Sequence, residues 1–122
     1  MKANQLRIGN LVYCKGIIDI IGGVEDNNYY TEKHYHGNTN EDLKPIPLTE
    51  EWLFKCAFIK LDDLDEVYYT LGNNEFHIKI EDKVFWIYFD EQPNHPITCV
   101  FNLHQLQNLY FALTENELNI TL

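Results

Sequence analysis

Serine is absent from this chain of 122 residues, and arginine occurs once, as Arg7. Without serine there is no Ser-His-Asp triad and no serine nucleophile. Lysine and arginine together number 9 against 19 aspartates and glutamates, so the net charge is −10. Proteins that bind nucleic acid gain most of their affinity by neutralising phosphates with clustered basic residues. The composition therefore argues against direct binding of nucleic acid.

Long apolar runs are also missing, and no run approaches the roughly 20 residues that a membrane-spanning helix needs. The first seven residues lack the apolar core of a signal peptide. We therefore expect no membrane contact and a location in the cytoplasm. The three cysteines, Cys14, Cys56 and Cys99, are far apart and form no C-x-x-C motif. In a reducing compartment we expect them to be free and mostly buried.

Motifs that hold a phosphate or a dinucleotide are missing as well. There is no G-x-x-x-x-G-K-[ST] run, and Gly22-Gly23 lacks the spacing of a dinucleotide-binding loop. We expect no cofactor. What the chain does contain is apolar material, with 45% hydrophobic and 14% aromatic residues. That is enough to form a core, and the length suits one domain, which we expect to span residues 1–122.

Short β-prone runs dominate the chain. The sequence predicts strands, most of them joined by tight turns, at residues 11–14, 17–21, 29–31, 66–71, 75–81, 84–89, 97–101 and 118–122. We expect turns at 15–16, 72–74 and 82–83. Residues 33–48, which include Pro45 and Pro47, are expected to form an exposed loop.

Two helix starts stand out. Thr49 is a good N-cap for a helix over residues 50–57, whose buried face would be Trp52, Leu53 and Cys56. Asn102 and Gln105 resemble a capping box for a second helix. The buried stripe of that helix would be Leu103, Leu106, Tyr110 and Leu113, with its polar residues, His104 and Gln107 among them, lying elsewhere. The predicted fold is α+β: a single small domain, mostly antiparallel sheet with two short helices packed on it.

Four carboxylates are concentrated at Asp62, Asp63, Asp65 and Glu66. One interpretation is a solvated turn. A second is a divalent-cation loop, although the D-x-[DN]-x-[DN]-G spacing is absent. The third is an acidic surface that docks on a basic partner, because a strong negative field accelerates such association.

Tyrosines form a second group of candidate contact residues. Tyr29, Tyr30 and Tyr35 fall in loops or at expected strand edges, as does the pair Tyr68-Tyr69. Tyrosine is favoured at interfaces because it combines apolar area with a hydroxyl group. The alternative is that half of each adjacent pair belongs to the core.

His34-x-His36 has the best metal-like spacing, since both rings of an extended segment point the same way. His77, His95 or a carboxylate would have to complete the site. The plainer interpretation is two loop histidines beside Tyr35.

A thiolate–imidazole pair is a further possibility for chemistry. It would join one of the three cysteines to His77 or His104. Each cysteine lies in an apolar run, however, where burial makes a thiol inert.

Three segments together resemble a known family. They are residues 2–10 (KANQLRIGN), 45–53 (PIPLTEEWL) and 104–114 (HQLQNLYFALT). The pattern is similar to short proteins encoded by phages and prophages of the Bacteroidota. The family brings no established activity and no catalytic residues. The resemblance implies a setting, a phage-borne product in a bacterial host cytoplasm.

Taken together, these features predict a protein that is not an enzyme and that acts by binding. The expected role is an inhibitor or modulator of a basic host protein that handles nucleic acid, such as a CRISPR effector or another nuclease. One alternative is an accessory or structural phage protein without a host target, which would self-associate through an edge strand. Another is a small metal-assisted hydrolase using His34 and His36.

Overall fold

The structure is a computed structural model of the whole chain. It describes residues 6–26, 28–63, 66–71, 76–89 and 95–122. The chain divides into two compact units, each of which is continued by a C-terminal segment. Unit 1 consists of Met1–Pro47 and Asn102–Glu117, and unit 2 consists of Leu48–Phe101 and Leu118–Leu122. The single-domain prediction for residues 1–122 stays a prediction.

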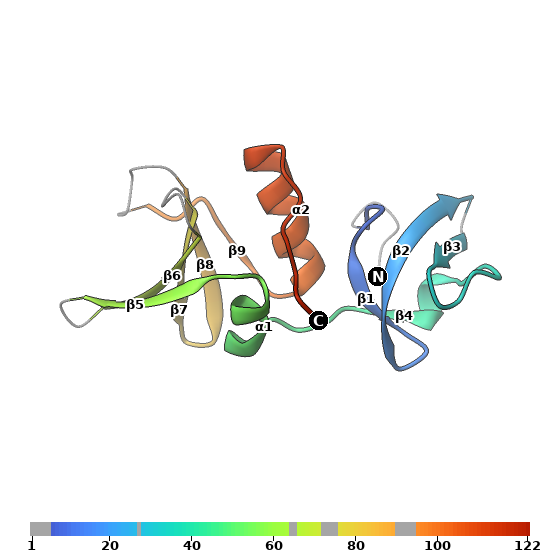
Figure 1. Cartoon of the computed structure of the whole chain (residues 1–122), viewed down its shortest axis with the longest axis horizontal. Coiled ribbons are helices and arrows are strands. Elements are labelled where there is room, and N and C mark those ends of the chain that lie inside the picture. Colours follow the sequence, from blue (N-terminus) through green and yellow to red (C-terminus); the bar gives the residue numbers. More distant parts are fainter. Residues whose placement is uncertain (1–5, 27, 64–65, 72–75, 90–94) are drawn as a thin grey trace. The chain divides into compact units, whose positions relative to one another are not determined.

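Unit 1 is built on a four-stranded antiparallel sheet in the order β3-β2-β1-β4 (Figure 1). Its elements are β1 (Leu11–Cys14), β2 (Ile17–Glu25), β3 (Asn28–Thr31), the 3-10 turn η2 (Asn40–Asp42), β4 (Leu43–Lys44) and α2 (Leu103–Thr114). Lys15 and Gly16 join β1 to β2 with positive φ at both positions, as a two-residue hairpin turn requires. Strand β2 is longer than predicted, and β4 lies within the expected loop.

The core of unit 1 combines residues from all of its strands. Its buried cluster contains Leu6, Val12, Cys14, Ile21, Tyr29 and Leu43. Helix α2 contacts β1, and Leu103 and Leu106 of its predicted stripe are fully buried. Tyr110 and Leu113 are only half-buried. Asn102 is the N-cap of this helix, and its backbone N–H donates to Gln105 Oε1 at 3.0 Å. This is the hydrogen bond that the Gln105 side chain contributes to the predicted capping box.

Unit 2 contains a five-stranded antiparallel sheet in the order β5-β6-β7-β8-β9. Its elements are α1 (Glu50–Lys55), β5 (Ile59–Asp63), β6 (Glu66–Thr70), β7 (Phe76–Glu81), β8 (Val84–Phe89) and β9 (Thr98–Val100). The meander β6-β7-β8-β9 follows the predicted strands, and Asp82 and Lys83 form the predicted tight turn. The predicted turn at 72–74 lies outside the described residues.

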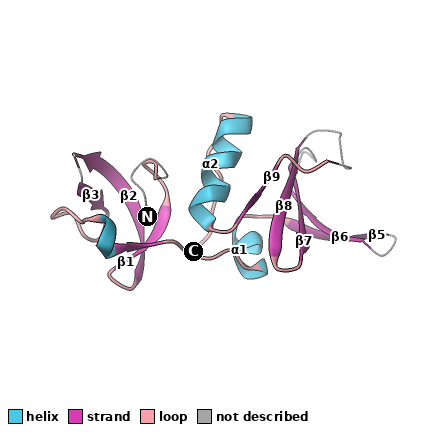
Figure 2. Ribbon diagram, turned by 180° about the vertical axis from the view of Figure 1, so that it is seen from behind, coloured by secondary structure: helices cyan, strands magenta, loops and turns pink. Residues whose placement is uncertain are grey.

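One face of this sheet is apolar and covered. Phe76, Ile78, Phe85 and Ile87 alternate along β7 and β8 and are buried, while Ile80 is half-buried. Helix α1, shown in cyan in Figure 2, contributes to this core with its predicted buried face, Trp52, Leu53 and Cys56. Thr49 caps α1 as predicted, accepting the Trp52 N–H at 3.3 Å. These features confirm the α+β prediction, with the strands shared between two sheets.

Three local predictions are wrong. Residues 118–122 do not form a strand, because Thr121 N–H donates to the carbonyl of Lys55 in α1 rather than to a sheet neighbour. Residues 59–63, for which no strand was predicted, form β5. His104 and Gln107, expected off the buried stripe of α2, are both buried. Neither described helix is long and apolar enough to cross a membrane.

Candidate functional site

The described residues of the acidic cluster lie on a hairpin. Asp62 and Asp63 end β5, and Glu66 begins β6, directly opposite Asp63. The turn between them, with Asp65, lies outside the described residues, as does the side chain of Asp63. Asp62 and Glu66 are both exposed, and Glu66 forms an ion pair with Lys79 of β7 at 3.3 Å. The structure therefore brings carboxylates from two strands to one end of the sheet.

Large aliphatic side chains are exposed on the same hairpin. Ile59 is 56% exposed, Leu61 38% and Val67 44%. We call Ile59, Leu61, Asp62, Glu66 and Val67 the hairpin surface. The strand register places Leu61 and Glu66 on one face and Asp62 and Val67 on the other. Figures 1 and 2 both show β5 and β6 extending past the other strands of their sheet, which explains why both faces are open.

A small cleft opens where the hairpin leaves the sheet. Strands β6 and β7 are paired at Tyr69–Ile78 and Thr70–His77, and no further pair is found among their described residues. Beyond those pairs lies a cavity of about 310 Å³ lined by Glu66, Val67, Lys79, Ile80 and Glu81. The lining thus combines two apolar side chains with two carboxylates and one ammonium group.

The base of the hairpin is anchored to α1. The buried hydroxyl of Tyr69 donates to the Glu50 carboxylate, and Lys60 Nζ lies 3.2 Å from the same oxygen. Burial, followed by the neighbouring carboxylate, raises the pKa of Tyr69 to about 12. The hydrogen bond from Tyr69, followed by Lys60, lowers the pKa of Glu50. Tyr69 therefore acts as a neutral donor that fixes the hairpin to the helix.

The predicted contact tyrosines occupy three different environments in unit 1. Tyr29 is buried in the core, and its hydroxyl group has no hydrogen-bond partner among the described residues. Tyr30 is half-buried, whereas Tyr35 is 67% exposed. Of the three, only Tyr35 is mostly exposed to solvent. In the adjacent pair Tyr29-Tyr30, Tyr29 is the residue that belongs to the core.

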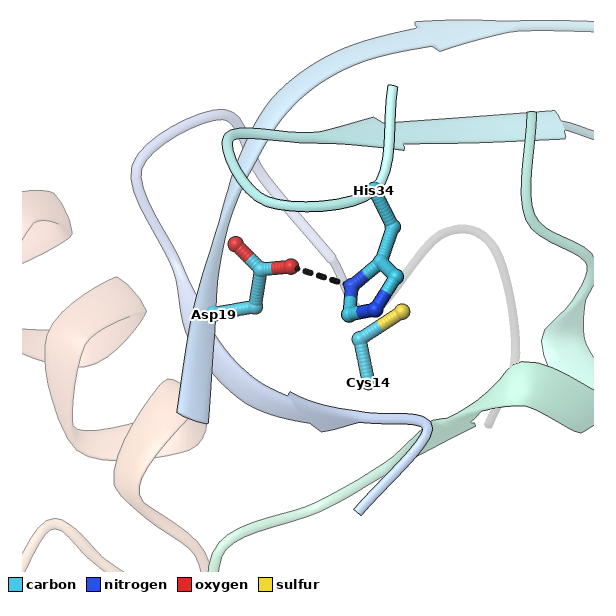
Figure 3. A group of neighbouring side chains, drawn as sticks. All are labelled: Cys14, Asp19 and His34. Atoms are coloured by element: carbon cyan, nitrogen blue, oxygen red, sulfur yellow. Dashed lines mark hydrogen bonds and ion pairs between the residues drawn. The ribbon is translucent and has the colours of Figure 1, made fainter. Parts of the chain in front are cut away.

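The two candidate metal-binding histidines are separated by the structure. His36 is exposed and lies against the Tyr35 ring, with the ring centroids 4.8 Å apart. His34 instead joins Cys14 and Asp19, and one potential ligand atom from each lies within 4.8 Å of the others (Figure 3). Of the residues proposed to complete the site, His77 belongs to the other unit.

Asp19 organises this group. Its Oδ1 atom accepts the backbone N–H groups of Ile20 and Lys33 at 2.9 and 3.0 Å, and its Oδ2 atom lies 2.9 Å from His34 Nδ1. Burial would raise the pKa of Asp19, but hydrogen bonds from Thr31, His34 and the two backbone groups outweigh it and lower the pKa. The sequence signal for this site is the single charged residue, Asp19, within the apolar run Ile17–Ile21. The sequence predictions did not include Asp19 in any site.

The cysteines are free, as predicted. Cys14 and Cys56 are buried, whereas Cys99 is half-buried. Burial raises the pKa of the Cys14 thiol, and it raises that of Cys56 to about 12. The imidazole beside Cys14 is that of His34, whereas the pair considered from the sequence involved His77 or His104. A buried thiol with a raised pKa is a poor nucleophile.

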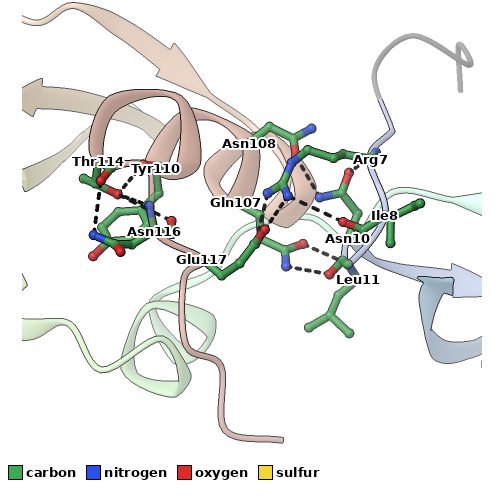
Figure 4. Close-up of polar contacts among 11 residues, drawn as sticks. Arg7, Ile8, Asn10, Leu11, Gln107, Asn108, Tyr110, Thr114, Asn116 and Glu117 are labelled. Atoms are coloured by element: carbon green, nitrogen blue, oxygen red, sulfur yellow. Dashed lines mark hydrogen bonds and ion pairs between the residues drawn. The ribbon is translucent and has the colours of Figure 1, made fainter.

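Two of the three segments that carry the family resemblance contact each other in unit 1 (Figure 4). Arg7 and Asn10 both donate to Asn108 Oδ1, at 3.1 and 2.7 Å. Gln107 accepts the Leu11 N–H at 2.8 Å and donates to the Gly9 carbonyl at 3.1 Å. These side chains bind the N-terminal segment to α2, so the motif residues in these contacts have a structural role in unit 1.

The third segment, residues 45–53, supplies further backbone links. The carbonyl of Ile46 accepts the N–H of Leu103 at 2.8 Å, and Pro47 forms a β-bridge with Asn102.

No family model, curated protein or solved structure matches this chain.

Proposed function

We propose that this chain is a non-enzymatic binding protein that docks on a basic partner through the hairpin surface. The observation that carries the proposal is the exposure of three large aliphatic side chains beside clustered carboxylates on one projecting hairpin. Ile59 and Leu61 share one face of the hairpin with Glu66, and exposed apolar groups beside charged ones are typical of protein interfaces.

Charge distribution favours a basic partner. Unit 2 contains eleven acidic and four basic residues, so it carries −7 of the net −10. The cleft beside the hairpin is lined by two apolar side chains, Val67 and Ile80, and by two carboxylates against one ammonium group, Glu66 and Glu81 against Lys79. This arrangement suits the long apolar stem and charged end of a partner's lysine or arginine.

The resemblance to phage and prophage proteins suggests which basic protein is bound. A nuclease that handles nucleic acid carries a basic channel, and an acidic ligand would compete for it. We therefore propose inhibition of a host defence nuclease, such as a CRISPR effector, in the bacterial cytoplasm.

The experiment is affinity capture from a Bacteroidota host lysate, with identification of the bound protein by mass spectrometry. A variant neutralises the cluster by changing Asp62, Asp63 and Asp65 to Asn and Glu66 to Gln. The matched control removes the same charge from four exposed acids of unit 1, by changing Asp26 to Asn and Glu25, Glu32 and Glu41 to Gln.

Capture of a basic nucleic-acid-handling protein by the wild type and the control, but not by the cluster variant, is the expected result. Binding should also weaken as salt rises, because the contact joins opposite charges. Equal capture by both variants, or affinity independent of salt, would contradict the proposal.

A second candidate is the accessory phage protein that self-associates through an edge strand. The observation in its favour is that β5 lies at the edge of its sheet with Ile59 and Leu61 exposed. Lys60 and Asp62, however, also lie on this strand, and charged edge residues oppose strand pairing between copies. Sedimentation of the purified protein distinguishes the two, since self-association predicts dimers that form without a partner.

A further inference from the structure

Cys14, Asp19 and His34 bring sulfur, oxygen and nitrogen atoms together inside unit 1. The three ligand atoms lie within 4.8 Å of one another, and Asp19 Oδ2 is 2.9 Å from His34 Nδ1. In a tetrahedral zinc site with normal bond lengths, ligand atoms are separated by about 3.3–3.8 Å. The Asp19–His34 distance is shorter than this range, and 4.8 Å is the upper limit for the other separations, so small side-chain movements would place all three atoms around one ion.

The ligands are held in place by contacts that a metal would leave intact. The two backbone N–H groups bind Oδ1 of Asp19, which leaves Oδ2 directed at the site. His34 is fixed through its backbone, because its N–H donates to Thr31 Oγ1 and its carbonyl accepts from Asn38 Nδ2 at 2.7 Å. Second-shell contacts of this kind orient metal ligands.

The donor set selects the class of metal. A thiolate and an imidazole favour Zn²⁺ over Mg²⁺ or Ca²⁺, which take oxygen ligands. Cys14 as thiolate and Asp19 as carboxylate together balance the two positive charges of the ion, which lowers the cost of burying it. The His34 side chain is 24% exposed, so a small ion can reach the group from solvent.

A cysteine nucleophile fits the same group less well. The side chain of Cys14 is fully buried, so a substrate larger than an ion or a water molecule has no access to the sulfur. A metal ion needs only the interior space between the three side chains, where Figure 3 shows the His34 ring beside both Asp19 and Cys14.

We propose that Cys14 Sγ, Asp19 Oδ2 and His34 Nδ1 bind one Zn²⁺ ion. The metal replaces the proton between Nδ1 and Oδ2 and links β1, β2 and the segment after β3. Three protein ligands leave the fourth position for water. This site lies in unit 1 and does not depend on the docking proposed for the hairpin surface.

The test uses Zn²⁺ and Co²⁺ with the full-length protein. Zinc affinity is measured by competition with a chromophoric chelator, and Co²⁺ provides a visible spectrum with a thiolate-to-metal charge-transfer band. The variants are Cys14→Ala and His34→Asn. The matched controls are Cys99→Ala, a thiol elsewhere in the chain, and His36→Asn, a histidine two residues from the site. Circular dichroism verifies that each variant folds.

One equivalent of zinc should bind the wild type and both controls, and Mg²⁺ in excess should not displace it. Each site variant should bind zinc at least about tenfold more weakly, and Cys14→Ala should abolish the Co²⁺ charge-transfer band. His34 is partly exposed, so His34→Asn provides the affinity result even where Cys14→Ala fails to fold.

Zinc should also raise the Tm of the wild type, and this rise should be lost in His34→Asn. Equal zinc affinity in wild type and His34→Asn would overturn the proposal. So would a charge-transfer band that persists in Cys14→Ala, or zinc that Mg²⁺ readily displaces, because these results would place the ion on the acidic surface.

Discussion

At the scale of single residues, the informative positions are the buried polar side chains, because each needs a partner or carries a cost. Gln107 is satisfied by two backbone groups of the N-terminal segment. The carboxylate of Asp19 has partners in His34 and in the backbone N–H groups of Ile20 and Lys33. His104 is different, since both of its ring nitrogens are buried and have no hydrogen-bond partner among the described residues.

His104 should make the stability of the fold depend on pH. Burial lowers its pKa below the ordinary value of about 6.5. Below that pH the unfolded chain binds a proton that the folded chain binds less readily, so stability falls as pH falls. Lowering the pH from 7.5 to 5.5 should cost up to about 1.4 kcal/mol through this residue.

The measurement is urea unfolding of the wild type and His104→Leu at both pH values. The loss on acidification should be smaller in His104→Leu, which has no imidazole to protonate. His36→Asn, which alters an exposed histidine, serves as the control and should behave as the wild type does. Identical pH dependence in His104→Leu and wild type would contradict this prediction, because it would show that His104 binds a proton equally well in the folded and unfolded chains.

At the scale of elements, both helices begin where the sequence indicates, and each docks through an apolar face. Helix α2 should depend strongly on Leu106, which is fully buried. Leu106→Ala should destabilise the protein by about 2–5 kcal/mol, because it removes apolar contacts and leaves a cavity. Leu113→Ala, at a half-buried position of the same stripe, should cost less. Denaturant unfolding compares the two, and equal losses would contradict the burial pattern.

Helix α1 is only six residues long, so its cap matters. Thr49→Ala removes the oxygen that accepts the Trp52 N–H and should cost about 1 kcal/mol of stability. Thr49→Ser keeps a hydroxyl group and should cost less. Thermal unfolding monitored by Trp fluorescence measures both changes. A loss that Ser does not reduce would indicate that the methyl group, rather than the cap, is responsible.

At the scale of the whole molecule, the net charge of −10 is the dominant feature. Among the described residues, Lys and Arg form ion pairs with Glu117, Glu51, Glu50 and Glu66, and these leave most of the acidic side chains unbalanced. Self-repulsion of this kind destabilises a compact state and is screened by salt.

The Tm should therefore rise as NaCl is increased from low to moderate concentration. The cluster variant of Asp62, Asp63, Asp65 and Glu66 should show a smaller rise, because it has less repulsion to screen. Scanning calorimetry across a salt series makes the comparison. A Tm that falls with salt would mean that the ion pairs outweigh the repulsion.

The sequence by itself determined the class of fold and most of its elements. Alternation along residues 76–81 places apolar groups on one face, and caps such as Thr49 mark helix starts, because these signals are local and independent of the rest of the chain. It also determined the acidic character that underlies the proposed docking. Residues 118–122 show the limit of such patterns, since their alternation indicates a strand but their backbone bonds to α1.

Tertiary structure alone decided which residues share a site. Cys14, Asp19 and His34 are brought together by strand register and by the loop that Asp19 anchors, and neither is encoded in their spacing. The hairpin of β5 and β6 likewise exposes Leu61 and Val67 where it extends past the sheet. Local patterns fix the conformation of a segment, but non-local packing fixes what lies beside it. For that reason His34 could be named from the sequence, whereas Cys14 and Asp19 could not be named as its neighbours.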